Sequence, residues 1–260
     1  MNETVVTFSK TEPIGTIIIN RPPVNSYDTQ FMQALDAAID EANGDPQVKA
    51  IILKSASEKF FSAGADIKAF QANSAETNTE MTRIAHRALE KIALSPKVFI
   101  AAINGHAFGG GLEMALACDL RFAAEGNFRL GLTEVALGLL PGNGGTQRLP
   151  RLIGANRALE MMLTGETVSP EEAYQLGLVN RLFPAETLFE ETEAYARKVA
   201  SGASIAIGKI KQAVYQGIDL PLNEALALER GLIEALFKTD DAQEGLTAFV
   251  EKRQPVFKGQ

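Results

Sequence analysis

The chain has 260 residues, of which 46% are hydrophobic and 22% charged, and its formal net charge is −7. This composition is typical of a globular protein, long enough for one large core or for a core with a smaller module. The acidic balance argues against a general nucleic-acid-binding surface, because such a surface needs a basic stripe. No apolar run approaches the roughly 20 residues that cross a bilayer.

Cysteine and histidine are rare in this chain. The single cysteine, Cys118, cannot form an internal disulfide, which fits a reducing compartment, and it is interpreted as a small buried hydrophobe. His86 and His106 are interpreted as structural or solvated, so no metal site built from imidazole and thiol groups is expected, while an all-carboxylate site stays open. The first eight residues resemble no signal peptide, and we expect a cytoplasmic enzyme.

The first half of the chain alternates strand-like and helix-like segments. Short β-rich runs occupy residues 15–19, 48–53 and 97–103. A helix capped by Asp28 and stopped by Gly44 is expected between the first two runs, and another helix, ended by Pro96, between the second and third. Residues 119–124 could add a further strand. Strands that alternate with helices predict an α/β core.

The second half of the chain is almost wholly helical. Ser169 begins a helix with a hydroxyl cap, proline at the first position and glutamate at the third, and Gly177 closes it. Further helical runs cover residues 189–200, 205–215, 222–237 and 243–252. From about Thr187 onward we therefore expect an appended helical layer, which could cover the core or bind another subunit.

Residues 104–113 place a carboxylate beside bare backbone amides. The three glycines at positions 109–111 let a ligand approach the backbone closely. The apolar run over 112–118 predicts a buried helix, whose start offers unpaired N–H groups and a positive dipole end to an anionic oxygen. Glu113 is the only charged residue in that run, so it needs a partner or a task.

Two other segments supply groups of complementary chemistry. In the turn over residues 60–68, small residues at positions 62–65 leave the backbone open, so the amide of Ala65 could join that of Gly110 in an oxyanion hole. One such donor is typically worth ~10²–10³ in rate. Glu134 is a second acid among apolar neighbours, followed by a glycine-rich loop. Two buried carboxylates tend to have raised pKa values and to share a proton, which suits addition of water to an activated double bond.

Each of these residues also has a structural interpretation. Glu113 alone could satisfy backbone amides at a helix start. Glu134 could cap a helix or pair with Arg129 or Arg148. Asp66 could cap the helix that follows it, and glycine runs often only turn the chain.

The motifs occur in a characteristic order along nearly the whole chain. They are Ile19-Asn20-Arg21-Pro22, Ser62-Ala63-Gly64-Ala65-Asp66-Ile67-Lys68, Asn104-Gly105, Gly109-Gly110-Gly111-Leu112-Glu113, Pro141-Gly142-Asn143-Gly144-Gly145-Thr146-Gln147-Arg148-Leu149, Leu163-Thr164-Gly165, Ala173-Tyr174-Gln175-Leu176-Gly177-Leu178-Val179 and Ala248-Phe249-Val250-Glu251-Lys252-Arg253. In this order they resemble the enoyl-CoA hydratase/isomerase family, also called the crotonase superfamily. The resemblance implies an α/β spiral of repeated ββα units over residues 1–187, which carries an acyl-CoA site, and a C-terminal helical trimerisation region over 188–260.

The resemblance also implies roles for individual residues. Ala65 and Gly110 match the two amides that hold the thioester oxygen, and Glu113 and Glu134 match the two acids of members that hydrate 2-enoyl-CoA. The implied substrate- and coenzyme-binding positions are Ala63, Asp66, Ile67, Lys68 and Gly142, with Phe249 and Lys252 reaching a neighbouring subunit's coenzyme.

The implied reaction is reversible syn addition of water to a trans-2-enoyl-CoA, as in fatty-acid β-oxidation. The implied enzyme is a homotrimer or a dimer of trimers with no cofactor, no metal, no nucleic-acid partner and no membrane. Alternatives are another crotonase-type reaction, namely double-bond isomerisation, a specialised dehydration or thioester hydrolysis, or a non-catalytic RNA-binding relative.

Three features depart from the family pattern. Thr133 stands where a proline commonly precedes the second acid, and one residue is inserted around positions 126–129, between the two acids. The segment Pro22-Pro23-Val24-Asn25-Ser26-Tyr27 is also distinctive. These differences could alter the acyl-chain preference or shift the second acid.

Overall fold

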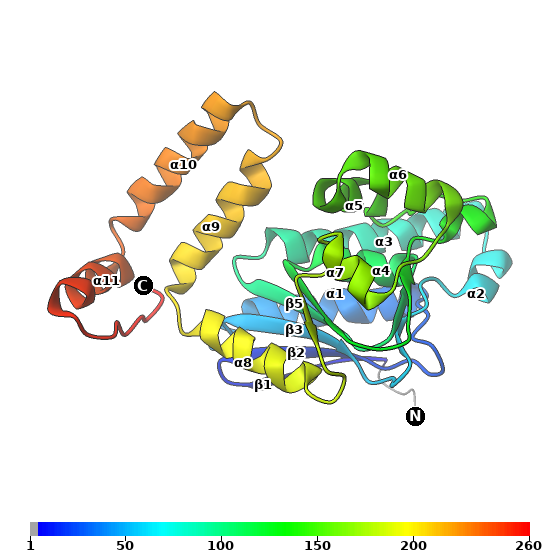
Figure 1. Cartoon of the computed structure of the whole chain (residues 1–260), viewed down its shortest axis with the longest axis horizontal. Helices are drawn as coiled ribbons and strands as arrows, with labels where there is room; N and C mark the ends of the chain where they lie inside the picture. The colour runs from blue at the N-terminus through cyan, green and yellow to red at the C-terminus, as the bar shows by residue number, and fades with distance from the viewer. Residues whose placement is uncertain (1–4) are drawn as a thin grey trace.

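The computed structural model describes residues 5–260. Residues 1–4, at the start of the stretch in which no signal peptide is expected, lie outside the described part. The chain forms an α/β core from which the last three helices extend as a separate arm (Figure 1). Within the described part, no helix combines the length and the apolar character needed to span a membrane.

Nine strands and eleven α-helices are assigned in the described residues. The strands are β1 (Val6–Thr11), β2 (Ile14–Ile19), β3 (Ala50–Ser55), β4 (Phe60–Ser62), β5 (Val98–Ile103), β6 (His106–Phe108), β7 (Leu120–Ala124), β8 (Leu130–Gly131) and β9 (Arg181–Phe183). The helices are α1 (Thr29–Gly44), α2 (Ile67–Ala72), α3 (Ala75–Leu94), α4 (Gly110–Ala117), α5 (Gly145–Ile153), α6 (Ala155–Thr164), α7 (Pro170–Gln175), α8 (Leu188–Ala200), α9 (Ser204–Gly217), α10 (Leu222–Leu236) and α11 (Asp240–Glu251), with a short 3₁₀ helix η1 (Glu134–Leu137).

The strands form two sheets, and from β3 to β8 successive strands alternate between them. The larger sheet has the order β1-β2-β3-β5-β7-β9, in which only the β1–β2 pair is antiparallel. The smaller sheet has the order β4-β6-β8 and is parallel throughout. Each of the strand pairs β3/β4, β5/β6 and β7/β8 therefore gives one strand to each sheet, which is the predicted spiral of ββα units.

Helices on the larger sheet explain why its strands are apolar. In β3 and β5, Ile51, Leu53, Phe99 and Ile100 are fully buried, as expected for parallel strands with both faces covered. Helix α1 packs on α3 and on β1 and β2, while α8 packs against β2, β3, β5 and β7 and lies in front of the sheet in Figure 1. The predicted α/β class is therefore confirmed, and the boundary at residue 187 stays a prediction.

The predicted elements are confirmed with shifted ends. The runs at 15–19, 48–53 and 97–103 become β2, β3 and β5, and residues 119–124 contain β7. The buried helix begins at Gly110 rather than 112, and the last helix begins at Asp240 rather than 243 because the Thr239 side chain accepts the N–H of Ala242. Strands β1, β4, β6, β8 and β9 were not predicted.

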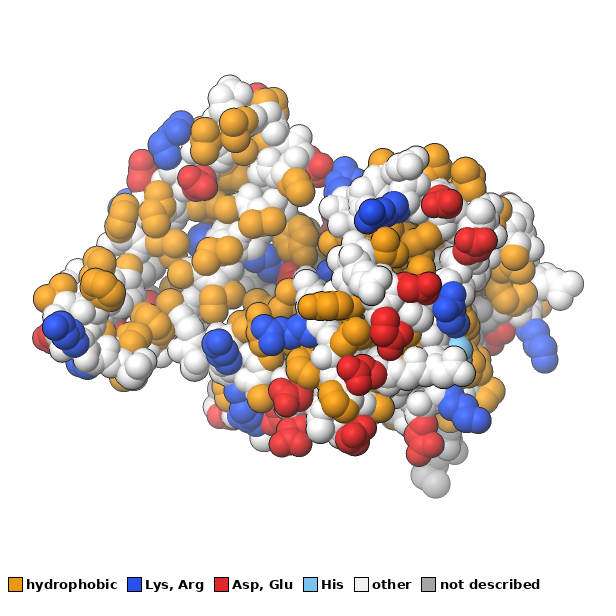
Figure 2. Space-filling view, in the orientation of Figure 1, with side chains coloured by type: hydrophobic (Ala, Val, Ile, Leu, Met, Phe, Trp, Pro, Cys, Tyr) orange, Lys and Arg blue, Asp and Glu red, His pale blue; other side chains and the backbone are white. Residues whose placement is uncertain are grey.

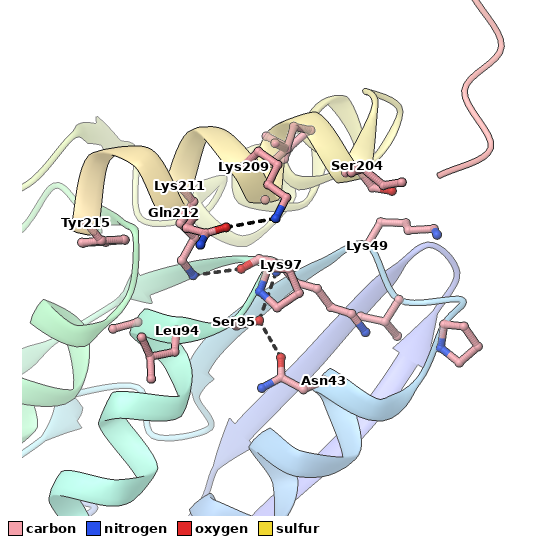
Figure 3. Close-up of a pocket in the computed structure, with 18 of the residues that line it drawn as sticks. Asn43, Lys49, Leu94, Ser95, Lys97, Ser204, Lys209, Lys211, Gln212 and Tyr215 are labelled. Atoms are coloured by element: carbon pink, nitrogen blue, oxygen red, sulfur yellow. Dashed lines mark hydrogen bonds between the residues drawn. The ribbon is translucent and has the colours of Figure 1, made fainter. Parts of the chain in front are cut away.

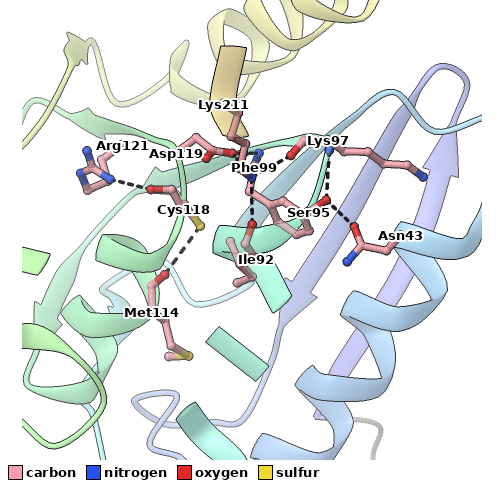
Figure 4. Close-up of polar contacts among 10 residues, drawn as sticks. All are labelled: Asn43, Ile92, Ser95, Lys97, Phe99, Met114, Cys118, Asp119, Arg121 and Lys211. Atoms are coloured by element: carbon pink, nitrogen blue, oxygen red, sulfur yellow. Dashed lines mark hydrogen bonds and ion pairs between the residues drawn. The ribbon is translucent and has the colours of Figure 1, made fainter. Parts of the chain in front are cut away.

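A buried ion pair joins the C-terminal arm to the core (Figure 4). The Lys211 ammonium on α9 donates to the carbonyls of Ile92 and Lys97, at 2.8 and 3.0 Å, and to the Asp119 carboxylate at 2.9 Å. The same Asp119 oxygen accepts the N–H of Phe99 at 2.8 Å. One side chain of α9 therefore contacts the end of α3, the start of β5 and the residue before β7.

A hollow of about 620 Å³ lies beside this contact, between α9 and the C-terminal ends of α1 and α3 (Figure 3). Lys97 crosses it and donates to the carbonyls of Ala42 and Asp45 at 2.7 and 2.6 Å. Lys97 and Lys211 at its wall therefore serve as links between separate elements of the fold.

The outer surface of the arm is strongly apolar, and Figure 2 shows apolar side chains spread over it. The exposed side chains include Ile210, Val214, Ile218, Leu222, Leu226, Ile233, Phe237, Leu246, Phe249 and Val250. Large exposed apolar surfaces mark interaction sites. The arm is thus the part of the described chain best suited to contact another molecule.

Candidate active site

Three of the predicted site residues lie at equivalent positions, each just after a strand of the smaller sheet. Ala65 follows β4, Gly110 follows β6 and Glu134 follows β8, in each case within three residues of the end of the strand. Because β4, β6 and β8 are parallel neighbours, their carboxyl ends lie at the same edge of the sheet. The repeat of the fold thus gathers groups that are distant in the sequence.

Gly64 allows the first two of these loops to touch. Its φ of +87° favours glycine, and a Cβ at this position would lie 2.8 Å from the Phe108 carbonyl and 3.3 Å from the Gly110 nitrogen. Among residues 5–260, neither the Ala65 nor the Gly110 backbone N–H donates to a protein acceptor. Two free donors on adjoining loops form the arrangement expected of an oxyanion hole.

Glu113 lies on α4, and only 1% of its surface is exposed. Its Oε1 accepts the backbone N–H groups of Asn143 and Gly145, both at 2.7 Å. The structural interpretation of Glu113 is therefore correct in part, since it satisfies amides at the start of α5 rather than of its own helix. Burial and, to a smaller extent, nearby Glu134 raise the pKa of Glu113 to about 7, although the two amides and Arg148 act to lower it.

Glu134 is the first residue of η1, and its Oε2 is buried without a hydrogen-bond partner in the described chain. Burial raises the pKa of this carboxyl group. The alternative ion pairs are wrong, because Arg129 contacts Glu172 at 3.5 Å and the Arg148 guanidinium donates to the Asn143 carbonyl at 2.9 Å. A partly buried acid with one unpaired, buried oxygen is suited to hold and release a proton.

Both acids and both amide-bearing residues line one cavity of about 440 Å³. Three of the predicted binding residues, Ala63, Ile67 and Gly142, also line it. The remaining wall is largely apolar and comprises Phe70, Ala136, Leu137, Leu139 and Leu140, with the polar residues Tyr27, Thr82, Thr133 and Asn143. The cavity can therefore take an apolar chain, polarise a carbonyl group and hold a small polar molecule between two acids.

The side chain of Asp66 has a structural task. It accepts the N–H groups of Lys68 and Ala69, each at 3.2 Å, at the start of α2, and it pairs with Arg21 at 3.3 Å. The helix-capping interpretation is correct for this side chain, and any ligand contact there would use its backbone. Lys68 is exposed and does not line the cavity.

Phe249 and Lys252 are not brought to the cavity within one chain. Phe249 lies on α11 and is 85% exposed, and Lys252 follows that helix with a φ of +56°. Helix α11 lies at the opposite end of the molecule from α2 (Figure 1). Contact with a coenzyme therefore requires another subunit, and this role stays a prediction.

The two histidines and the cysteine have the expected structural contacts. The His86 Nε2 donates to the Gly142 carbonyl at 2.5 Å, and the His106 Nδ1 accepts the N–H of Arg129 at 3.1 Å. Cys118 is buried, and burial raises the pKa of its thiol to about 12. In the described part of the chain no cluster of three or more His, Cys, Asp or Glu residues could hold a metal ion.

Two buried polar residues of the cavity were missed as individual site candidates. Tyr27 and Asn143 are both buried, and the Asn143 Nδ2 donates to the Tyr27 hydroxyl at 2.6 Å. The signal in the sequence was the distinctive segment that ends at Tyr27, but its partner lies 116 positions away.

Comparison with known proteins agrees with this geometry. The family model for enoyl-CoA hydratase/isomerase matches residues 9–260. A crotonyl-CoA hydratase from Syntrophomonas wolfei is 36% identical over 97% of each chain, and a mitochondrial enoyl-CoA hydratase from Pongo abelii is 40% identical over 96% of this chain and 86% of its own.

Solved structures extend the match to three dimensions. An enoyl-CoA hydratase from Geobacillus kaustophilus is 48% identical with a TM-score of 0.97, covering 100% of this chain and 98% of its own. One from Bacillus anthracis is 39% identical with a TM-score of 0.94, covering 98% and 100%. With the spiral of ββα units and the paired acids, these matches show that the chain belongs to the enoyl-CoA hydratase/isomerase family.

Proposed function

We propose that this chain is an enoyl-CoA hydratase that adds water reversibly to a trans-2-enoyl-CoA and yields a 3-hydroxyacyl-CoA. The observation that carries the proposal is the cavity in which Ala65 and Gly110 present free amides beside the two acids Glu113 and Glu134. Relatives named crotonyl-CoA hydratase and short-chain-enoyl-CoA hydratase support the same reaction.

The two amides act on the thioester carbonyl. The N–H groups of Ala65 and Gly110 donate to its oxygen, which draws electron density from the conjugated double bond and makes C3 electrophilic. As water attacks, negative charge accumulates on the same oxygen, so these hydrogen bonds are stronger in the transition state than in the ground state. Each donor contributes ~10²–10³ in rate.

The two acids move the protons. Glu113, with a pKa of about 7, is largely ionised in mildly alkaline solution and takes a proton from water as the oxygen bonds to C3. Glu134 lines the same cavity and gives a proton to C2, and burial raises the pKa of its carboxyl group. Water has then been added across the double bond, and proton exchange between the coupled acids restores the starting state.

The remaining predicted residues bind the substrate. Ala63 and Ile67 border the cavity, and the amide of Gly142 steadies the attacking water. The backbone of Asp66 and Lys68, on either side of Ile67 along the chain, contacts the coenzyme portion of the substrate outside the cavity. The coenzyme is part of the substrate, and no separate cofactor takes part in this mechanism.

The enzyme works as a homotrimer or a dimer of trimers in the cytoplasm. Residues 188–260 form its oligomerisation region and residues 1–187 its catalytic core. The exposed apolar surface of α9–α11 supports this assembly. So does the position of α11, which carries Phe249 and lies at the opposite end of the chain from α2, so that its contact with a coenzyme needs a neighbouring subunit.

Hydration of crotonyl-CoA by the purified protein tests the proposal, with Glu113→Gln and Glu134→Gln as variants. We expect rapid loss of the conjugated thioester absorbance with the wild type and a large loss of rate in both variants. Near-normal rates in both variants would defeat the mechanism. Hydrolysis of the thioester, or isomerisation of a 3-enoyl-CoA without hydration, would instead support another reaction of the family.

A further inference from the structure

The backbone of Tyr27 clamps the first loop of the oxyanion hole. Its N–H donates to the Gly64 carbonyl at 2.8 Å, and its carbonyl accepts the N–H of Asp66, also at 2.8 Å. These bonds lie on either side of Ala65, which pairs with Tyr27 as an isolated parallel bridge. The Ala65 amide is thus held between two fixed points of the Tyr27 backbone.

The side chain of Tyr27 contacts the second loop. A Cβ at Gly110 would overlap the Tyr27 hydroxyl and two carbon atoms of its ring, so the phenol lies directly on the backbone that carries the second amide. Only 4% of Tyr27 is exposed, and burial raises the pKa of its hydroxyl above the ordinary value. This phenol therefore remains protonated throughout the working range of pH.

Asn143 connects this phenol to the acid on α4. Its side-chain amide donates to the Tyr27 hydroxyl at 2.6 Å, while its backbone N–H donates to Glu113 at 2.7 Å. Asn143 stands between Gly142 and Gly144, and Gly144 has a φ of +105°. Because glycines leave this loop little intrinsic stiffness, the bond to Tyr27 is a strong restraint on the Asn143 backbone.

We propose that Tyr27 is a positioning residue that fixes both oxyanion amides and, through Asn143, the Glu113 carboxylate in one geometry. The proposal deepens the proposed hydratase function and rests on it for its kinetic consequences. Tyr27 neither transfers a proton nor replaces an amide. It joins the loop of Ala65, the backbone of Gly110 and the loop of Asn143. Their relative placement decides whether the attacking water and the thioester carbonyl are held in a reactive geometry.

The environment of Glu113 gives this role a measurable signature. The titratable and charged groups that influence Glu113 are Glu134 from η1, Arg148 from α5 and Tyr27 itself. The Asn143 N–H stabilises the ionised form of Glu113 and so lowers its pKa. Loosening Asn143 would therefore raise that pKa, even in a variant that keeps every titratable group of the wild type.

The kinetic experiment uses Tyr27→Phe, Asn143→Ala and the double variant. Tyr27→Phe keeps the ring against Gly110 and removes only the hydroxyl, while Asn143→Ala keeps the backbone N–H. For crotonyl-CoA we expect kcat to fall about tenfold in each, with KM changed less than about twofold, because small displacements near reacting groups affect the chemical step most. The acid limb of the pH profile of kcat/KM should move to higher pH, and the double variant should be no slower than the slower single variant.

An infrared titration of protein labelled with ¹³C-glutamate gives a second readout that needs no turnover. Subtracting the spectrum of Glu113→Gln isolates the Glu113 carboxylate, whose pKa should rise in Tyr27→Phe and Asn143→Ala. Tyr174→Phe, at a half-exposed tyrosine on α7, is the matched control and should behave as the wild type.

The outcomes separate the two proposals. Additive losses, losses confined to KM, or an unchanged Glu113 pKa in both variants would overturn the positioning role of Tyr27. A wild type that hydrates no enoyl-CoA, but whose Glu113 pKa rises in the variants, would refute the hydratase function and leave the positioning role standing. If Tyr27→Phe does not fold, Asn143→Ala decides both readouts.

Discussion

Glu113 accepts the backbone N–H of Gly145 at 2.7 Å, so the acid of α4 also caps the first backbone N–H of α5. The Asn143 N–H bonds to the same carboxylate oxygen, which leaves Oε2 without a bond to the described chain. One carboxylate is thus both a structural acceptor and a candidate base, and different substitutions can separate the two tasks.

Substitutions of Glu113 should separate stability from activity. Glutamine keeps a side-chain oxygen for the two amides, so Glu113→Gln should fold normally while kcat for hydration falls ~10²–10⁴. Glu113→Ala leaves two buried N–H groups unpaired and should lower the free energy of unfolding by about 1–3 kcal/mol for each group. Urea denaturation and steady-state hydration of crotonyl-CoA measure the two effects, and equal stability of both variants would contradict the structural task.

The raised pKa of Glu113 predicts opposite effects of pH on activity and stability. Activity needs the ionised base, so kcat/KM, which reports the pKa values of the free enzyme, should rise with pH through about 7. Because the folded-state pKa lies above the ordinary 4.5, the protonated form favours folding, and this stabilisation is lost as pH rises from about 4.5 to about 7.

Denaturation at pH 5 and pH 8 tests the sign of this linkage. The difference in unfolding free energy between the two pH values should be smaller in Glu113→Gln than in the wild type by on the order of 3 kcal/mol. Identical pH dependence in both proteins would mean that Glu113 titrates normally.

Gly110 is expected to tolerate no side chain. In Gly110→Ala the added Cβ would overlap the Tyr27 phenol, so either the phenol or the backbone that carries the Gly110 amide must move. We expect kcat to fall at least as far as for loss of one oxyanion donor, ~10²–10³. Gly44→Ala is the matched control, since a Cβ there meets nothing within 4 Å, and its activity should be that of the wild type.

Lys211→Met should weaken the attachment of the arm to the core. The substitution removes the partner of the Asp119 carboxylate, which is buried, and such a loss typically costs 3–5 kcal/mol. Adding Asp119→Asn removes the stranded charge, so the double variant should recover part of the stability. Thermal and urea denaturation compare the three proteins, and a double variant less stable than Lys211→Met would refute the ion-pair account.

Patterns within the chain predicted the elements whose stabilising contacts are evident locally. The apolar runs of β2, β3 and β5 are typical of strands buried on both faces, and the Asp28 and Ser169 caps accept N–H groups within the next three residues. Strands β4, β6 and β8 have two or three residues each, so only pairing with distant neighbours creates them.

The candidate site also has parts that the local sequence predicts and parts that only distant contacts create. A lone charge in an apolar helix directed attention to Glu113, but its amide partners lie 30 and 32 positions further on. The Tyr27–Asn143 bond depends on a contact across the fold that no periodicity encodes. The helix-capping role of the Asp66 side chain was one of two open interpretations, and the distance to its N–H partners selected it.

Because successive coils of the chain contribute Ala65, Gly110 and Glu134 separately, the scaffold is modular in its chemistry. A change in the loop after β8 can replace or move the second acid, while the amides in the loops after β4 and β6 still donate to a carbonyl oxygen. Selection can therefore exchange the reaction performed on a thioester without rebuilding the apparatus that activates it.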